Sequence, residues 1–162
     1  MKARDWGALK VLLLFVWAAW LTVVFTTNVL DGLKALGFLS EGWAFASANF
    51  RFLVATTARY GTPMWLDAIL FAGVIVWDAF AAALFWRATF LFPRRAMNGS
   101  RPVHLAFTVS LALWGGFLLA DEIFIAYEVE AKHLLLFTAQ LATLQVIELL
   151  PERSASTSST AG

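Results

Sequence analysis

A nearly uninterrupted apolar stretch, Ala68–Trp86, constrains the fold more than any other part of the sequence. It is 19 residues long and contains one ionisable side chain, Asp78. A helix of that length matches the apolar thickness of a bilayer, which takes about 20 residues to cross. An acid inside such a helix costs about 2.5–3.5 kcal/mol on insertion and therefore faces other helices. The stretch predicts a transmembrane helix with one polar group directed into a helix bundle.

The composition of the whole chain supports the same class. Of its 162 residues, 60% are hydrophobic and 14% are charged, whereas a soluble domain has about 25% charged residues. The formal net charge of +1 provides no large positive field, which argues against nucleic acid as a partner. The chain has no cysteine, so disulfides, thiolate metal sites and thiol catalysis are excluded.

Two further segments have the length and apolarity of membrane spans. Residues 11–30 and 103–120 contain no Asp, Glu, Lys or Arg, and each is long enough to cross a bilayer. The span that contains Asp78 is expected over 64–86, because Pro63 suits the first turn of a helix, where its missing N–H costs nothing.

The last apolar segment, 133–150, is the weakest span. Gln140, Gln145 and Glu148 interrupt it. Its start can extend back toward Tyr127. We nevertheless interpret it as a fourth span.

The segment between the first two spans is less apolar. Residues 43–57 place large apolar groups on much of a helix surface, but Asn49 and Arg51 fall in the middle. This composition favours a helix that lies in the membrane interface or folds back over the bundle. The sequence thus predicts an all-α, four-helix transmembrane bundle as one domain over 1–150, followed by a disordered polar tail over 151–162.

Lysine and arginine are distributed unevenly over the connectors. The N-terminal segment, the 87–102 connector and the tail carry eight of the 12 Lys and Arg residues. By the positive-inside rule, both termini and this connector are expected to be cytoplasmic. Arg94, Arg95 and Arg101 are therefore topology determinants, and they are also candidates to contact anionic lipid headgroups, at about 1 kcal/mol each.

Asp78 lies about 12–14 Å along its helix from Arg87, the expected cytoplasmic edge. In one interpretation it is a neutral or hydrogen-bonded group that holds helices in register. In two others it belongs to a proton or solute pathway, or it pairs with a basic residue of another subunit. The polar residues expected near its depth are Trp17, Ser110, Gln140, Thr143 and Gln145.

Small residues identify the faces that are expected to pack closely. They are Ala79, Ala82 and Ala83 in the second span and Gly115 and Gly116 in the third. The chain also has eight Trp and 15 Phe, which are typical of membrane interfaces and helix contacts and do not imply a pigment or quinone. No cofactor is predicted.

Glu130 and His133 have the spacing that puts a carboxylate and an imidazole on one helical face. Di-iron bundles use two such pairs with further carboxylates, but this chain has one pair. An acidic outer loop is the simpler interpretation, and a metal site is the weaker alternative. His104 and His133 are expected at opposite membrane faces, about 25–30 Å apart, which excludes a bis-histidine haem site within one chain.

Five short motifs run along the chain: NVLD at 28–31, NFRFL at 49–53, VWDA at 76–79, WGGF at 114–117 and EIF at 122–124. Their pattern resembles the bacterial predicted small integral membrane protein family, domain of unknown function 2165. The resemblance implies four membrane-spanning helices in a bacterial inner membrane and carries no established activity. The chain departs from the family in a longer stretch between Asp31 and Asn49, and in apolar residues around Ala55 and Leu70 where the family has histidines.

No phosphate-binding glycine loop, G-x-S-x-G or H-E-x-x-H motif occurs in the sequence. We therefore expect a non-catalytic accessory or scaffold subunit, with membrane lipids and other membrane subunits or a second copy as partners. The alternative is a proton or small-solute pathway through Asp78. A metal or redox enzyme that uses Glu130 and His133 is the third hypothesis.

Overall fold

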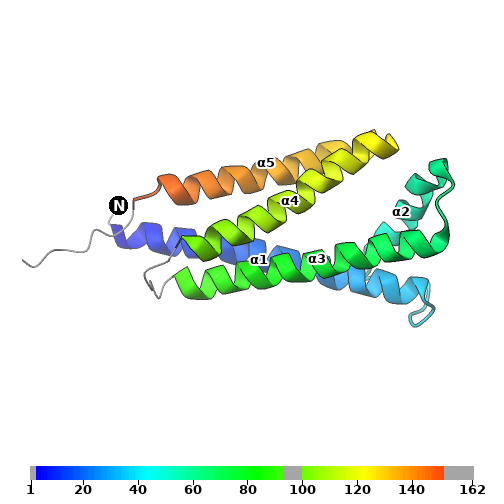
Figure 1. The fold of residues 1–162 in the computed structure, drawn as a ribbon. Helices are drawn as coiled ribbons and strands as arrows, with labels where there is room; N and C mark the ends of the chain where they lie inside the picture. The colour runs from blue at the N-terminus through cyan, green and yellow to red at the C-terminus, as the bar shows by residue number, and fades with distance from the viewer. Residues whose placement is uncertain (1–2, 93–99, 152–162) are drawn as a thin grey trace, which may run out of the picture.

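The computed structural model describes residues 3–92 and 100–151, and every regular element in these ranges is a helix. The predicted all-α class is confirmed. Arg94 and Arg95, and the tail beyond Pro151, lie outside the described residues. The elements in chain order (Figure 1) are α1 (Ala3–Ala35), α2 (Asn49–Thr57), the short 3₁₀ helix η1 (Ala58–Tyr60), α3 (Met64–Leu91), α4 (Arg101–Phe124) and α5 (Tyr127–Leu149).

Three of the described helices, α1, α3 and α4, are long and apolar enough to cross a membrane. This agrees with the expectation of a membrane protein. Helix α5 has 23 residues but is less apolar, because it contains the glutamines and the glutamate that weaken the last predicted span.

The long helices form two antiparallel pairs. Helices α1 and α3 lie along each other, α4 and α5 form a hairpin, and α4 packs against α3. Helix α1 begins and α5 ends at the same end of the molecule (Figure 1), and α3 ends and α4 begins there as well. We refer to this as the terminal end. Helix α2 lies at the opposite end, which we call the distal end.

The helices extend beyond the apolar runs that predict them. Helix α1 continues to Ala35 and α5 begins at Tyr127, because polar residues are tolerated in a helix once it leaves the bilayer core. The expected helix over 43–57 is shorter, since only Asn49–Thr57 is helical and the residues before it form turns. Ala48 ends those turns in the left-handed region, at φ 62°.

The apolar core lies toward the terminal end and depends on small residues. Ala18 of α1, Ala81 and Ala88 of α3, and Ala106 of α4 are fully buried, which lets the helix backbones approach closely. Around them pack larger side chains, such as Phe85 and Phe107 with ring centroids 4.9 Å apart, and the core also includes Leu14, Leu21, Leu84, Val103 and Ile147.

Of the three alanines that the sequence predicts to pack closely, Ala82 is buried in the core. Ala83 is exposed and Ala79 is half-buried, because the buried face of α3 passes through residues 78, 81, 85 and 88. Gly116 is exposed, and a Cβ added at Gly115 would make only an ordinary contact, 3.8 Å from Phe137. The two glycines are therefore not required for close helix packing.

Candidate functional site

Three buried carboxylates, Asp31, Asp67 and Asp78, surround the docking site of α2 at the distal end. They are 6%, 1% and 1% exposed. A buried carboxylate is costly unless hydrogen bonds or a cation compensate for its lost water. Within the described ranges, none of the three forms an ion pair with lysine or arginine, and each instead accepts hydrogen bonds from α2, from α1 or from the turn before α2.

Asp78 is linked to α2 through two side-chain amides. Asn28 of α1 donates from Nδ2 to Asp78 Oδ2 at 2.8 Å, and Asn49 at the start of α2 donates to Asn28 Oδ1, also at 2.8 Å. Asn28 is 2% exposed, so its amide obtains both bonds from protein groups. The chain of bonds fixes the register of α1 against α3 and positions α2 over both helices.

Asp31 caps the N-terminus of α2 from a neighbouring helix. Its Oδ2 accepts a hydrogen bond from the backbone N–H of Phe50 at 2.8 Å and another from the Ser47 hydroxyl at 3.1 Å. The first N–H groups of a helix lack partners within the helix, and the helix dipole favours a negative charge beside them. Since α2 has no acid of its own in its first turn, Asp31 supplies this charge.

Asp67 holds the other end of α2. The Thr57 hydroxyl, in the last residue of α2, lies 2.8 Å from Asp67 Oδ1 in the first turn of α3 and donates to it. Both residues are buried. Helix α2 is thus attached at its start and at its end, in both cases to the α1–α3 pair.

The polar residues predicted near Asp78 do not form hydrogen bonds with it. Trp17 donates from Nε1 to the Thr143 hydroxyl at 3.2 Å, which joins α1 to α5. Some buried polar atoms have no hydrogen-bond partner among the residues that the structure describes: the Ser110 hydroxyl, both polar atoms of the Gln140 side chain, and Trp114 Nε1. Gln145 is exposed on α5. None of these groups bonds to Asp78, whose partner is Asn28.

Asn28 is the site residue that the sequence interpretation missed. A span over 11–30 places Asn28 at its outer edge, whereas α1 runs to Ala35 and keeps Asn28 inside the helix, opposite Asp78. The polar pair Asn28 and Asp31, one helical turn apart, could have indicated a buried polar face at this end of the helix.

In the part of the chain that the structure describes, Glu130 and His133 do not belong to a group of three or more Asp, Glu, His or Cys side chains that could hold a metal ion. His133 Nδ1 instead lies 2.6 Å from Asp121 Oδ2 of α4, and its ring stacks on Phe117 at 5.0 Å. His104 contacts Glu148 at 2.9 Å near the other end of the hairpin. The two histidines therefore join α4 to α5 at opposite ends.

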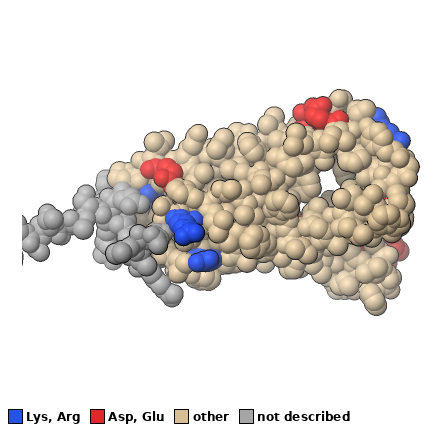
Figure 2. Space-filling view, viewed as in Figure 1, with Lys and Arg blue, Asp and Glu red and all other residues tan. Residues whose placement is uncertain are grey.

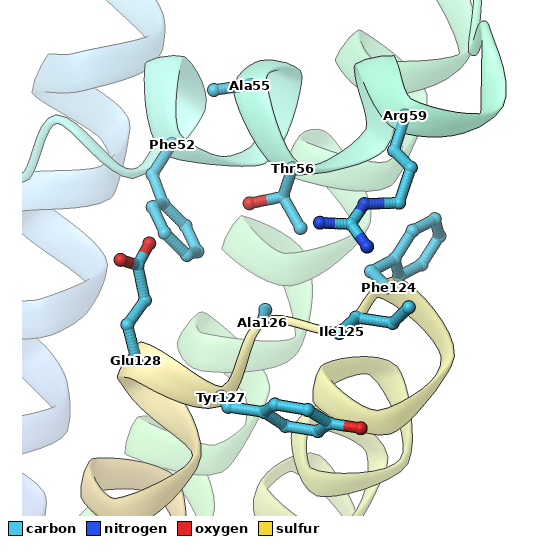
Figure 3. A pocket seen from close by; sticks show the side chains of 9 residues that line it. All are labelled: Phe52, Ala55, Thr56, Arg59, Phe124, Ile125, Ala126, Tyr127 and Glu128. Atoms are coloured by element: carbon cyan, nitrogen blue, oxygen red, sulfur yellow. The ribbon is translucent and has the colours of Figure 1, made fainter.

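A pocket of about 350 Å³ lies at the distal end between α2–η1 and the turn that joins α4 to α5. Figure 3 shows Arg59 and Thr56 on one side and Tyr127 and Glu128 on the other. In the space-filling view, the molecule is open beside α2, below the α4–α5 hairpin (Figure 2). The complete lining is Phe52, Ala55, Thr56, Arg59, Phe124, Ile125, Ala126, Tyr127 and Glu128.

Of the predicted inner-side arginines, Arg101 is the first residue of α4 and is exposed. It lies at the terminal end, about the length of a span away from the pocket. Comparison of the chain with protein families, with curated proteins and with solved structures found no match. Its function is therefore inferred from these residues and contacts.

Proposed function

We propose that the chain is a four-span protein of the bacterial inner membrane, with both termini in the cytoplasm, that acts as a non-catalytic accessory or scaffold subunit of a larger membrane complex. The three apolar helices and the similar length of α5 support four spans. The excess of lysine and arginine in the termini and the α3–α4 connector supports the orientation. The resemblance to domain of unknown function 2165 supports the same architecture.

The outward face of α5 carries the proposal. Gln140 and Ile147 are buried against the bundle, while Thr138, Ala142 and Gln145 are exposed on the opposite side at helical spacing. In a bilayer, an amide that faces hydrocarbon lacks partners for its donors and acceptor, which costs several kcal/mol. A neighbouring helix with a polar group removes this cost. This face fits a transmembrane helix of another subunit.

The buried carboxylates support a structural role inside the bundle. Asp78, the strongest candidate for chemistry, already accepts a hydrogen bond from Asn28 of the neighbouring helix. Asp31 and Asp67 are likewise engaged with α2. Polar residues that form hydrogen bonds between membrane helices set the register of those helices. A scaffold subunit requires a fixed helix register and does not require a reactive acid.

Purification from native membranes in a mild detergent tests the proposal. We expect at least one other chain to co-purify with the wild type, and the Gln145→Leu variant to lose most of it. The matched control is Val76→Leu on α3, which is 68% exposed and apolar already, and it should retain the partner. A monomer without a co-purifying chain would contradict the proposal, as would equal losses in both variants.

A second candidate function is a proton or small-solute pathway. It is favoured by polar atoms of Ser110 and Gln140 inside the bundle that have no hydrogen-bond partner in the described part of the chain. Asp78→Asn distinguishes the two, because the new amide oxygen still accepts from Asn28. A pathway through Asp78 requires this variant to lose transport in proteoliposomes while it keeps wild-type stability. If Asp78 only sets the helix register, the variant should match the wild type in both transport and stability.

A further inference from the structure

The pocket at the distal end has walls that are held apart by the fold. Its α2 wall is attached to α1 and α3 through Asp31, Asn49 and Thr57. Its other wall is the α4–α5 turn. Tyr60 bridges the two, because its hydroxyl donates to the Ile123 carbonyl at 2.6 Å and its ring packs on Phe124 at 5.5 Å. The pocket is therefore formed before any ligand enters.

Its volume suits a small polar group rather than a whole lipid. About 350 Å³ is near the lower limit of small-molecule sites, which range from about 300 to 1,000 Å³. The turn that forms one wall contains Ile125 at φ 53°, where a β-branched residue is strained. Strain of this kind persists where the surrounding structure imposes it, and it is concentrated at ligand sites.

The pocket carries one charge of each sign on opposite walls. Arg59 comes from η1 and Glu128 from the first turn of α5. The two do not form an ion pair with each other, and Figure 3 shows the guanidinium near Thr56 and Phe124 and the carboxylate near Phe52. Separated charges of this kind are complementary to a zwitterion that is long enough to reach both.

The side chains also specify the chemistry of each end of the ligand. A guanidinium binds phosphate through two parallel hydrogen bonds. A carboxylate accepts hydrogen bonds from a primary ammonium, and an aromatic ring beside it, here Phe52, attracts the same cation. Two exposed aromatic residues lie at the pocket, Tyr127 in its lining and Tyr60 against Phe124. Such residues are typical of the level of lipid headgroups.

We propose that this pocket binds a phosphoethanolamine group, with the phosphate on Arg59 and the ammonium on Glu128. The group can come from the headgroup of phosphatidylethanolamine or from free phosphoethanolamine. The site is independent of the outward face of α5, so it can be correct whether or not the chain is a scaffold subunit.

Native mass spectrometry of the full chain, purified in detergent and mixed with short-chain lipids, tests this assignment. We expect phosphatidylethanolamine to bind at least about tenfold more tightly than phosphatidylcholine, whose quaternary amine cannot donate to Glu128, or phosphatidylglycerol, which has no cation. Equal binding of the three lipids overturns the proposal, as does the absence of binding by both the lipids and free phosphoethanolamine. This comparison needs no variant.

Two variants locate the site. Arg59→Gln and Glu128→Gln should each weaken phosphatidylethanolamine binding about tenfold. Arg51→Gln and Glu122→Gln are the controls, since both residues are exposed near this end and neither lines the pocket. Equal effects of pocket and control variants would overturn the assignment of the site.

A parallel titration with free phosphoethanolamine distinguishes the sources. If the lipid and the soluble compound both bind to the wild type, and both pocket variants lose both ligands, the result supports recognition of the phosphoethanolamine group itself. Binding of the lipid alone, with the same loss in both variants, supports a lipid-headgroup site. Binding of the soluble compound alone supports a solute site at the membrane surface.

Discussion

Removing the carboxylate of Asp78 tests whether the hydrogen bonds that connect Asp78, Asn28 and Asn49 stabilise the bundle. In Asp78→Leu, Asn28 Nδ2 loses the oxygen 2.8 Å away. Asn28 is 2% exposed, so water does not replace the lost partner, and an unpaired buried donor costs about 1–3 kcal/mol. We therefore expect the free energy of unfolding to fall by about 1–3 kcal/mol. In Asp78→Asn the new carbonyl oxygen still accepts the bond, and the expected loss is below about 1 kcal/mol.

The double variant Asp78→Leu/Asn28→Leu isolates the interaction. It leaves Asn49 without its acceptor, but Asn49 is exposed and can bond to water. The double variant should consequently be less destabilised than the sum of the two single variants. Double-mutant cycles of hydrogen bonds between membrane helices average about 0.6 kcal/mol and reach about 1.7, and we expect a coupling energy in the upper part of that range because both residues are fully enclosed.

Equilibrium unfolding in mixed detergent micelles with increasing dodecyl sulfate, followed by tryptophan fluorescence, provides the measurement. Thr89→Val is the matched control, because the Thr89 hydroxyl is also buried in α3 but bonds to the Phe85 carbonyl of its own helix. It should cost less than about 0.5 kcal/mol. The reasoning fails if Asp78→Leu unfolds like the wild type, or if the two single effects add within about 0.3 kcal/mol.

The remaining stability predictions concern an unpaired amide and two backbone positions. Gln140 is fully buried, and neither polar atom of its side chain has a partner within residues 3–92 and 100–151. Gln140→Leu should therefore raise the free energy of unfolding by about 1 kcal/mol in the same assay, whereas a decrease would mean that the amide is hydrogen-bonded in the membrane. Ala48→Gly should stabilise by about 1 kcal/mol because Ala48 has φ 62°. Gly61→Ala, at φ 65°, should destabilise by a similar amount, and effects of the same sign in both variants would contradict the backbone argument.

The helices were predictable because length and apolarity are local properties of the sequence. The runs around Val11, Ala68 and Val103 have too few polar groups to fold in any other way in a bilayer. The start of α2 was not predictable on this basis. It begins at Asn49 because Asp31, from a helix that ends 14 residues earlier, binds the N–H of Phe50. A cap supplied from another helix cannot be inferred from local propensity.

The site was predictable only in part, for a related reason. The cost of inserting an acid predicts that Asp78 faces other helices, and it is 1% exposed. Its partner depends on how α1 is rotated and how far it extends, and depth along the bilayer does not determine either. The pocket could not be predicted from the sequence, because Arg59 and Glu128 line it from elements that are nearly 70 residues apart.

The two ends of the bundle associate by different means, and this difference accounts for the position of the pocket. Apolar burial gives little driving force between helices in lipid, so close contact and hydrogen bonds must hold them together. At the terminal end, Ala18, Ala81 and Ala106 bring α1, α3 and α4 into contact. At the distal end, the described side-chain hydrogen bonds of α2 reach α1 and α3, and Tyr60 supplies the bond to α4. At that end the α4–α5 hairpin is joined to η1 through Tyr60, and the pocket lies between the hairpin and α2. This space is where the fold can admit a ligand without loss of its packed core.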